Sequence, residues 1–305
     1  MVCKKCDTEP VYLLTSGVRL CRSCFIKYFE KKVRKTIRIN NLIEKGDKIC
    51  VAISGGKDSL TVLNILNTLT KKKNFELFAL LIDEGIKNYR DFTIKDAEKF
   101  CNENKIKLHI VSFKDELGYT LDEMIKILGM KPCTVCGVFR RYLLNKKARE
   151  LKANKLATGH NMDDEAQTVI MNQFKKNIDV SARLGPMTGV KDDKRFIRRI
   201  KPLYLMSEKE VGTYAFLKQL MGKFTECTYE NDSFRGDVRD MLNDFEMKHH
   251  GVKNNIITSF LEILPMLKNK YKNKSTINAC ISCKEPTSSD QCKACELKDK
   301  LKEKA

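Results

Sequence analysis

The chain contains 305 residues, of which 42% are hydrophobic and 32% are charged. This composition is too apolar for a wholly disordered chain, and the longest apolar runs, such as residues 77–82, are far too short to cross a membrane. The 58 lysines and arginines outnumber the 39 acidic residues and give a formal net charge of +19, which favours a polyanionic partner. The first residues contain no apolar stretch of the kind found in secretory signals, so a cytoplasmic protein is expected.

Cysteine spacing is the strongest pattern in the chain. Ten of the 13 cysteines form five CxxC pairs. An odd number of cysteines in a protein without a secretory signal indicates metal thiolates rather than a disulfide framework. Four of the pairs form two terminal sets: Cys3, Cys6, Cys21 and Cys24, and Cys280, Cys283, Cys292 and Cys295. Such sets are typical of structural zinc, so we expect zinc ribbons at residues 1–30 and 276–305, each stabilised mainly by its metal.

Residues between the two terminal modules predict alternating strands and helices. Basic and apolar residues alternate at 33–40, which indicates a basic connecting helix within a linker at 31–48. Short apolar runs predict strands at 49–53, 75–82, 108–113 and 156–158, with helices between them at 60–69, 88–104 and 137–153. Strands that alternate with helices and lack hairpin turns indicate a doubly wound α/β fold, with a parallel sheet covered on both faces.

The rest of this α/β region is less regular. Residues 197–203 predict an edge strand that Pro202 ends, and residues 207–220 predict a helix with Glu210 at the capping-box position. We assign residues 49–250 to a catalytic domain and residues 251–275 to a connecting helical segment.

A glycine-containing loop follows the first predicted strand and precedes a helix. Its residues are Ser54, Gly55, Gly56, Lys57, Asp58 and Ser59. Two glycines allow a tight turn that points amide groups at an anion, and the next helix adds its positive end. Lys57 adds a mobile positive charge. Asp58 either orients a metal ion or pairs with amides at the helix start, and the spacing excludes a Walker A loop.

Two further polar segments follow predicted strands. Asp83, Glu84 and Gly85 end the second strand, and residues 159–167, which include His160, Asp163 and Asp164, follow the fourth. In the crevice at the carboxyl ends of the strands, these acids could bind Mg²⁺ or accept a proton, with His160 near a nucleotide. The alternative is that Asp163 and Asp164 only begin the next helix.

The central pair, Cys133 and Cys136, has no second CxxC pair nearby. The remaining cysteines are Cys50, Cys101 and Cys227. Cys50 lies in a strand and Cys101 on the apolar face of a helix, so both are expected to be buried core thiols. Cys227 is the natural third member of the central set, and three thiolates would leave a coordination position open for chemistry.

The glycine loop resembles the pyrophosphate loop of N-type ATP pyrophosphatases, which transfer AMP to an oxygen and release pyrophosphate. The whole pattern resembles the TtuA/NcsA-type tRNA 2-thiouridine synthetases over essentially the entire chain. It comprises the terminal double CxxC motifs, the loop, the central CxxCG followed by Arg140 and Arg141, the segment at 157–168, and the later single cysteine.

This resemblance implies cofactors, partners and site residues. It implies a 4Fe–4S cluster on Cys133, Cys136 and Cys227, with one iron free to hold sulfide, besides two structural zinc ions and ATP with Mg²⁺. Its substrate would be tRNA, and the protein would usually be a homodimer. The catalytic candidates are Asp164, Arg140, Lys57 and Asp58. The nucleotide-binding candidates are Ser54, Gly55, Gly56, Lys57, Asp58, Ser59, Asp83, Gly159 and His160.

The implied reaction is adenylation of uridine O2 followed by attack of cluster-held sulfide on C2. The zinc modules would either contact tRNA or only support the core. Basic residues would neutralise tRNA phosphates, and the candidates are Arg140, Arg141, Arg183, Arg198, Arg199 and Lys201. The wobble uridine is favoured, and T-loop thiolation stays open, as does the sulfur source, either sulfide or a carrier protein ending in a thiocarboxylate. Two other hypotheses remain: cluster-free persulfide chemistry at Cys133 and Cys136, and a non-catalytic zinc-ribbon RNA-binding protein.

Overall fold

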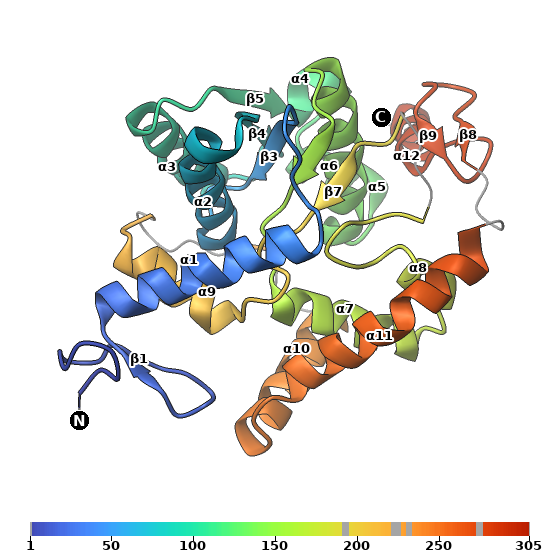
Figure 1. Cartoon of the computed structure of the whole chain (residues 1–305). Coiled ribbons are helices and arrows are strands. Elements are labelled where there is room, and N and C mark those ends of the chain that lie inside the picture. Colours follow the sequence, from blue (N-terminus) through green and yellow to red (C-terminus); the bar gives the residue numbers. More distant parts are fainter. Residues whose placement is uncertain (1, 191–194, 221–226, 230–233, 273–276, 305) are drawn as a thin grey trace.

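A parallel five-stranded sheet forms the centre of the computed structural model, which describes residues 2–190, 195–220, 227–229, 234–272 and 277–304 (Figure 1). Its strands are β3 (Lys48–Ile53), β4 (Glu76–Asp83), β5 (Leu108–Ser112), β6 (Lys155–Ala157) and β7 (Arg198–Ile200). Every neighbouring pair is parallel. The predicted α/β sheet is therefore confirmed, including its edge strand, which ends before Pro202.

The strand order β5-β4-β3-β6-β7 places a switch point between β3 and β6. From β3 the chain moves outward through β4 to β5 and then returns to the other side of β3 for β6 and β7. Connections that leave adjacent strands in opposite directions open a crevice at the carboxyl ends of those strands. The loop after β3 and the segment after β6 both lie at this crevice.

Alternate strand residues point to opposite faces of the sheet. Ile49 and Val51 join one buried cluster, whereas Cys50 joins another. The first face is covered by α1 (Arg22–Ile39), α2 (Lys57–Lys73), α3 (Arg90–Glu103) and α9 (Glu208–Leu217). The second is covered by α4 (Phe113–Leu117), α5 (Leu121–Leu128), α6 (Pro132–Glu150) and α12 (Lys293–Lys304). Cys50 and Cys101 are fully buried, as expected for core thiols.

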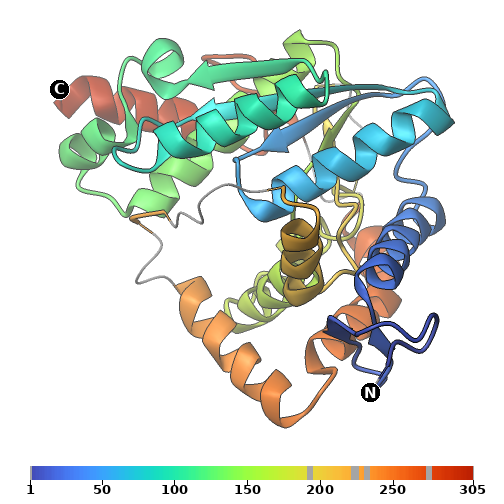
Figure 2. The same ribbon diagram turned by 90° about the vertical axis from the view of Figure 1, so that its left-hand side faces the viewer.

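A third buried cluster lies apart from the sheet. It is formed mainly by α7 (Met162–Phe174), α10 (Phe234–Lys248) and α11 (Val252–Lys272), with α8 (Ile178–Ser181) packed against α7 and α11. Figures 1 and 2 both show α10 and α11 below the sheet. This arrangement supports α7 from outside the sheet while its first turn faces the crevice.

The two terminal cysteine modules lie on opposite sides of the molecule in both views (Figures 1 and 2). Each contains a short antiparallel hairpin, made by β1 (Tyr12–Leu13) with β2 (Arg19–Leu20) and by β8 (Asn278–Ala279) with β9 (Pro286–Thr287). The first module continues directly into α1, which covers the sheet. The second packs α12 against α5 and α6. Among the described residues, no helix is long and apolar enough to span a bilayer.

Three helices begin earlier than the sequence predicts, and two predicted strands are too long. Helix α2 starts at Lys57 rather than residue 60, and β7 ends at Ile200 rather than residue 203. Helix α1 starts at Arg22 rather than residue 33, and α6 starts at Pro132 rather than residue 137. Proline is favourable at the first helical position because its missing N–H would have no partner there. Phe113, predicted as strand, begins α4 because the Ser112 side chain caps that helix. The predicted helix at 207–220 is confirmed as α9, with the capping box between Ser207 and Glu210.

Candidate functional site

The glycine loop forms a preorganised anion site at the start of α2. Gly55 has φ +81°, and a Cβ there would lie 2.4 Å from the carbonyl oxygen of Thr93, so the backbone requires glycine. Ser59 Oγ accepts a hydrogen bond from Ser54 N at 3.1 Å and donates to Gly56 O at 2.9 Å. Gly56 is the N-cap of α2, and no side chain caps this helix. The amide groups of its first turn are therefore available to a phosphate.

Lys57 is held at the edge of this loop by two carboxylates. Its Nζ lies 3.0 Å from Asp58 Oδ2 and 3.0 Å from Glu208 Oε1. Burial lowers the pKa of Lys57, but the two carboxylates outweigh it and the net shift is upward, so the lysine stays charged. Glu208 was not identified from the sequence, because it follows β7 and reaches Lys57 only in the folded chain.

The segment after β6 brings the start of α7 against the start of α2. Asn161 caps α7 by accepting from the amides of Asp163 and Asp164, and its side-chain amide donates to Asp58 Oδ1 at 3.1 Å. A Cβ on Gly159 would lie 2.9 Å from the backbone of Asp58 and Ser59, so glycine permits this close approach. Two helix N-termini thus converge on one crevice, which favours anions.

The two adjacent aspartates of α7 have different surroundings. Asp163 is buried, pairs with Lys253 of α11 and accepts from the amide of Glu208 at 2.8 Å. Asp164 faces the crevice, where burial raises its pKa to about 6. The amide of Asn161 opposes that rise and the charge of Asp58 adds to it. A carboxyl group that titrates near neutrality is suited to proton transfer, so Asp164 is the better candidate.

His160 and Asp83 complete the rim of the crevice. The imidazole of His160 is accessible to solvent and lies 2.9 Å from Thr158 Oγ1 through Nδ1. Desolvation by the surrounding protein, together with the charges of Lys201 and three arginines, lowers the pKa of His160 to about 3, so the ring is neutral. Asp83 ends β4 next to β3 and accepts from the amide of Gly85 at 2.8 Å. Both lie at the carboxyl edge of the sheet with the glycine loop.

The central cysteines lie at the start of α6. Their spacing of three places Cys133 and Cys136 on one helix face, in the first two turns, where no side chain caps the helix. Cys133 is exposed and its Sγ donates to the carbonyl of Tyr229 at 3.4 Å. Cys136 is buried and accepts a hydrogen bond from Arg140 Nη2 at 3.0 Å.

The segment that carries Cys227 packs against the same cluster. Cys227 is half-buried and Tyr229, two residues later, contacts Cys133. Burial raises the pKa of the Cys136 thiol to about 11; Arg140 opposes the rise, and Glu84 and Cys227 contribute to it. The segment around Cys227 therefore lies beside the start of α6, in contact with Cys133 through Tyr229 and close enough for Cys227 to affect the Cys136 thiol.

Three contacts lead from Arg140, the partner of Cys136, to the glycine loop. Arg140 Nε forms an ion pair with Glu84 Oε1 at 2.7 Å, and Glu84 also pairs with Arg90. Arg90 Nη1 donates to the carbonyl of Ser54, the first loop residue, at 2.9 Å. The sequence offered Glu84 only as one of several acids that could bind Mg²⁺ or accept a proton, and it assigned no role to Arg90; the structure instead pairs Glu84 with two arginines.

The basic residues predicted to meet RNA phosphates differ in availability. Lys201 is buried and its Nζ lies 2.6 Å from Glu165 Oε1, so that expectation is wrong for this residue. Arg183 is exposed and pairs weakly with Asp179 at 3.4 Å. Burial, followed by Arg141, lowers the pKa of Arg199 to about 10, which indicates a positive region beside His160. Arg198 Nη1 contacts the sulfur of Met187 at 3.2 Å.

The two terminal sets have the geometry of single-ion sites. In each set the four sulfurs lie within 4.8 Å of one another, and these are the two such groups among the described residues. Cys6 and Cys24 sulfurs are 3.6 Å apart, and those of Cys283 and Cys292 are 3.7 Å apart. Four thiolates about 2.3 Å from a tetrahedral zinc ion would be about 3.8 Å apart, so the residues fit zinc.

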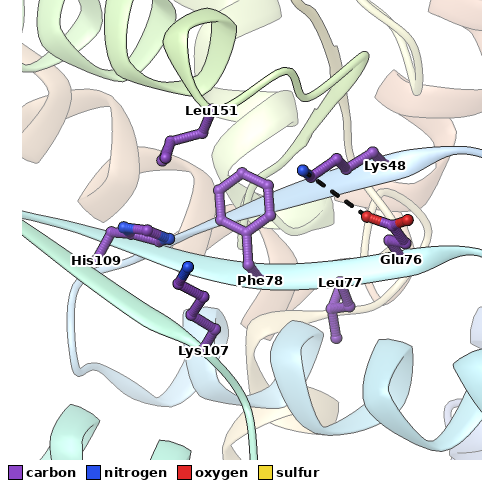
Figure 3. Close-up of a pocket in the computed structure, with 7 residues that line it drawn as sticks. All are labelled: Lys48, Glu76, Leu77, Phe78, Lys107, His109 and Leu151. Atoms are coloured by element: carbon purple, nitrogen blue, oxygen red, sulfur yellow. Dashed lines mark ion pairs between the residues drawn. The ribbon is translucent and has the colours of Figure 1, made fainter.

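An open pocket of about 180 Å³ lies at the opposite edge of the sheet (Figure 3). It is lined by Lys48, Glu76, Leu77, Phe78, Lys107, His109 and Leu151. Its lining includes the amino ends of β3 and β4, and Lys48 pairs with Glu76 at 3.8 Å. Ligands of open α/β sheets bind at the carboxyl ends, so this pocket is not the candidate site.

Comparison with known proteins gives consistent results. Residues 27–244 match the family model described as the PP-loop domain. The tRNA 2-thiolation protein NcsA of Haloferax volcanii is 35% identical over 97% of this chain and 98% of its own. The cytoplasmic tRNA 2-thiolation protein 1 of Dictyostelium discoideum is 37% identical over 97% of this chain and 82% of its own. The U34-tRNA thiolase NcsA from Methanococcus maripaludis, solved with its 4Fe–4S cluster, superposes with a TM-score of 0.83 at 36% identity, covering 99% of this chain and 96% of that chain.

Proposed function

Because the chain belongs to the PP-loop family, and within it to the NcsA-type tRNA 2-thiolation proteins, we propose that it replaces the O2 oxygen of a tRNA uridine by sulfur in an ATP-dependent reaction. The observation that carries this proposal is the connection between the glycine loop and the cysteine set through Arg90, Glu84 and Arg140. A nucleotide bound at the loop and sulfur held at the cysteines would then react with the same uridine.

The first step is adenylation. The amides at the start of α2 and the charge of Lys57 would bind the phosphates, with Mg²⁺ held by Asp58 and Asp83 at the rim. Uridine O2 attacks the α-phosphorus, and the bond to the departing pyrophosphate breaks. Asp164, with a pKa of about 6, would accept the uridine N3 proton. Ser54, Gly55, Gly56, Ser59, Gly159 and His160 would shape the nucleotide site.

The second step is displacement of AMP by sulfur. The residues that would hold a 4Fe–4S cluster are Cys133, Cys136 and Cys227. They fit it because two of the thiols stand at the uncapped start of α6 beside Arg140 and the Cys227 segment packs against the same buried cluster of side chains. The chemistry such a cluster supplies is a bound sulfide nucleophile. Sulfur would thereby replace oxygen at C2 as the C2–O bond breaks, and AMP would leave with that oxygen. Arg141 and Arg199 provide positive charge beside His160 for the RNA backbone.

The proposal includes partners and location. We place two structural zinc ions in the terminal sets, because the sulfur separations match tetrahedral coordination. The wobble uridine is favoured because the structurally similar protein from Methanococcus maripaludis is a U34-tRNA thiolase. Sulfide or a thiocarboxylate carrier would supply the sulfur, and the active protein would be a homodimer. It would work in the cytoplasm, where the name of the Dictyostelium relative places that protein.

Anaerobic reconstitution tests the proposal. The protein should contain about four irons per chain and, with ATP and sulfide, should form 2-thiouridine in tRNA. Nucleoside mass spectrometry of digested fragments identifies the position, and a T-loop fragment would replace the wobble assignment. Thiolation by protein that contains zinc but no iron would favour persulfide chemistry at Cys133 and Cys136. Binding of tRNA without thiolation would favour a non-catalytic RNA-binding protein.

A further inference from the structure

A buried carboxylate joins the two halves of the proposed site. Glu84 has no exposed surface, and its two oxygens form ion pairs with Arg90 on one side and Arg140 on the other. A buried charge without partners is strongly destabilising, so this carboxylate fixes both cations. One carboxylate between two guanidiniums leaves an excess positive charge, and Arg140 directs it toward the Cys136 sulfur.

The two arginines depend on Glu84 to different degrees. Arg90 is 3% exposed and also donates to the carbonyls of Ser54 and Ile82, so the surrounding backbone holds it in place. The Arg140 side chain is 43% exposed. Within the described parts of the chain, the only hydrogen-bond or ion-pair partners of its guanidinium are Glu84 and Cys136. Removing Glu84 would therefore release Arg140 while leaving Arg90 in place.

We propose that Glu84 is a positioning residue that fixes Arg140 against Cys136, and that Arg90 ties this arrangement to the glycine loop. The inference rests on the proposed function for the roles of the loop and the cysteines. Arg140 then acts as a fixed donor to a ligand sulfur rather than as a proton shuttle, because its Nε faces Glu84 while its Nη2 donates to Cys136. Donors of this kind orient metal ligands and tune the cluster they hold.

Two variants of Glu84 separate the effect of its charge from the effect of its side-chain length. Glu84→Gln removes the charge. Glu84→Asp keeps the charge beside Arg90 but shortens the side chain by one methylene, which withdraws it from Arg140. The matched control is Asp47→Asn, since Asp47 is also buried and pairs with Lys155 at 2.8 Å at the opposite edge of the same sheet. All three lose a buried ion-pair contact, but only the first two lie next to Arg140.

Iron retention is the main measurement. After anaerobic reconstitution, both Glu84 variants should lose iron to a chelator faster than wild type by about 10-fold to 100-fold, the range seen when outer partners of metal ligands are removed. Their reduction potentials should also move away from that of wild type, whereas zinc content should not change. Asp47→Asn should match wild type in iron loss and potential, even where its thermal stability is lower.

A second measurement needs no cluster. In metal-free protein, alkylation mapped by peptide mass spectrometry should show a severalfold change in the ratio of Cys136 to Cys133 labelling for both Glu84 variants, and no change for Asp47→Asn. Wild-type iron retention, potential and labelling ratio in a folded Glu84→Asp protein would overturn the inference. A wild-type protein that never binds iron would count against the proposed cluster, while the labelling ratio would still decide the role of Glu84.

Discussion

The terminal cysteine sets and the central set use the same residue in different surroundings. Each terminal set packs four sulfurs within 4.8 Å of one another, as a single ion requires. The central pair instead starts a helix, with one thiol exposed and the other hydrogen-bonded to an arginine. A closed set of four favours structural metal, and an incomplete set beside a cation favours a reactive centre. Substitutions should therefore affect stability at the ends and catalysis at the centre.

Loss of the zinc ion proposed for the C-terminal module should give the largest effect. Cys280 is fully buried, and Cys280→Ser should remove one zinc ion and unfold the packing of α12 on α5 and α6. Structural zinc binds zinc-finger peptides with apparent free energies of about 10–16 kcal/mol, so little else in so short a module can compensate. Metal analysis and limited proteolysis of residues 277–304 measure the result. Unchanged zinc content and protease resistance would contradict the comparison.

Loss of a central cysteine should leave the fold intact. We expect Cys136→Ala to abolish detectable thiolation while both zinc ions remain and thermal unfolding changes little. Cys101→Ala is the matched control, because Cys101 is equally a buried thiol but lies in α3, where it belongs to the core. Thiolation assays and metal content distinguish the two variants. Thiolation that survives Cys136→Ala would place the sulfur chemistry elsewhere.

The adjacent aspartates of α7 should separate catalysis from stability. Asp164→Asn should lower the thiolation rate by about 10²-fold to 10⁴-fold, the usual contribution of a general acid or base. Asp163→Asn breaks the buried pair with Lys253 and should instead cost about 3–5 kcal/mol of unfolding free energy. The thiolation rates of both variants are measured at saturating concentrations of ATP and tRNA. Equal rate losses in two folded variants would show that the crevice does not distinguish these carboxylates.

Glycine substitutions test whether the tight packing of the glycine loop makes a change there more destabilising than one at an open turn. Gly55 and Gly118 have similar positive φ values, +81° and +86°, but only Gly55 has neighbouring atoms where a Cβ would lie. Gly118→Ala should cost about 1–2 kcal/mol for the left-handed backbone. Gly55→Ala should cost about 1–3 kcal/mol more, because Thr93 must move, and it should weaken ATP binding. Urea unfolding and calorimetry give both values; equal costs would mean that the Thr93 contact relaxes freely.

A pH dependence of stability should be the smallest effect. The pKa of Asp164 is raised to about 6 in the folded chain, so the folded state binds more protons than the unfolded state between about pH 4 and pH 6. Unfolding free energy should therefore fall as pH rises through that range, and Asp164→Asn should remove this part of the slope. Thermal unfolding of both proteins across the range checks the sign. A slope that rises in wild type relative to the variant would contradict the shift.

The sequence predicted those parts of the site that depend on local pattern. The parallel sheet, the loop from Ser54 to Ser59 and the two terminal cysteine sets follow from periodicity, glycine placement and spacing. The predicted helix at 137–153 begins too late, because Pro132 marks the first position of α6. The sequence therefore did not predict that Cys133 and Cys136 stand at the start of a helix.

Contacts between distant segments could not be predicted in the same way. Glu84 meets Arg140, 56 positions later, only because β4 and α6 pack together, and nothing in the local pattern gives that register. The local pattern likewise left the roles of Asp163 and Asp164 inseparable, since their directions depend on where Asn161 caps α7, and only the family resemblance singled out Asp164. The same reason explains Lys201: it is a surface cation by composition, but the fold buries it against Glu165.

The side chain of Asn161 fixes the angle between the starts of α2 and α7, since it caps one helix and bonds to the first turn of the other. The positive potential there arises from backbone dipoles inside a crevice, at distances shorter than the roughly 8 Å Debye length of physiological salt. Added electrolyte should therefore weaken nucleotide affinity little. Attraction of RNA to exposed lysines and arginines should weaken steeply under the same conditions, so the two ligands would differ strongly in their sensitivity to ionic strength.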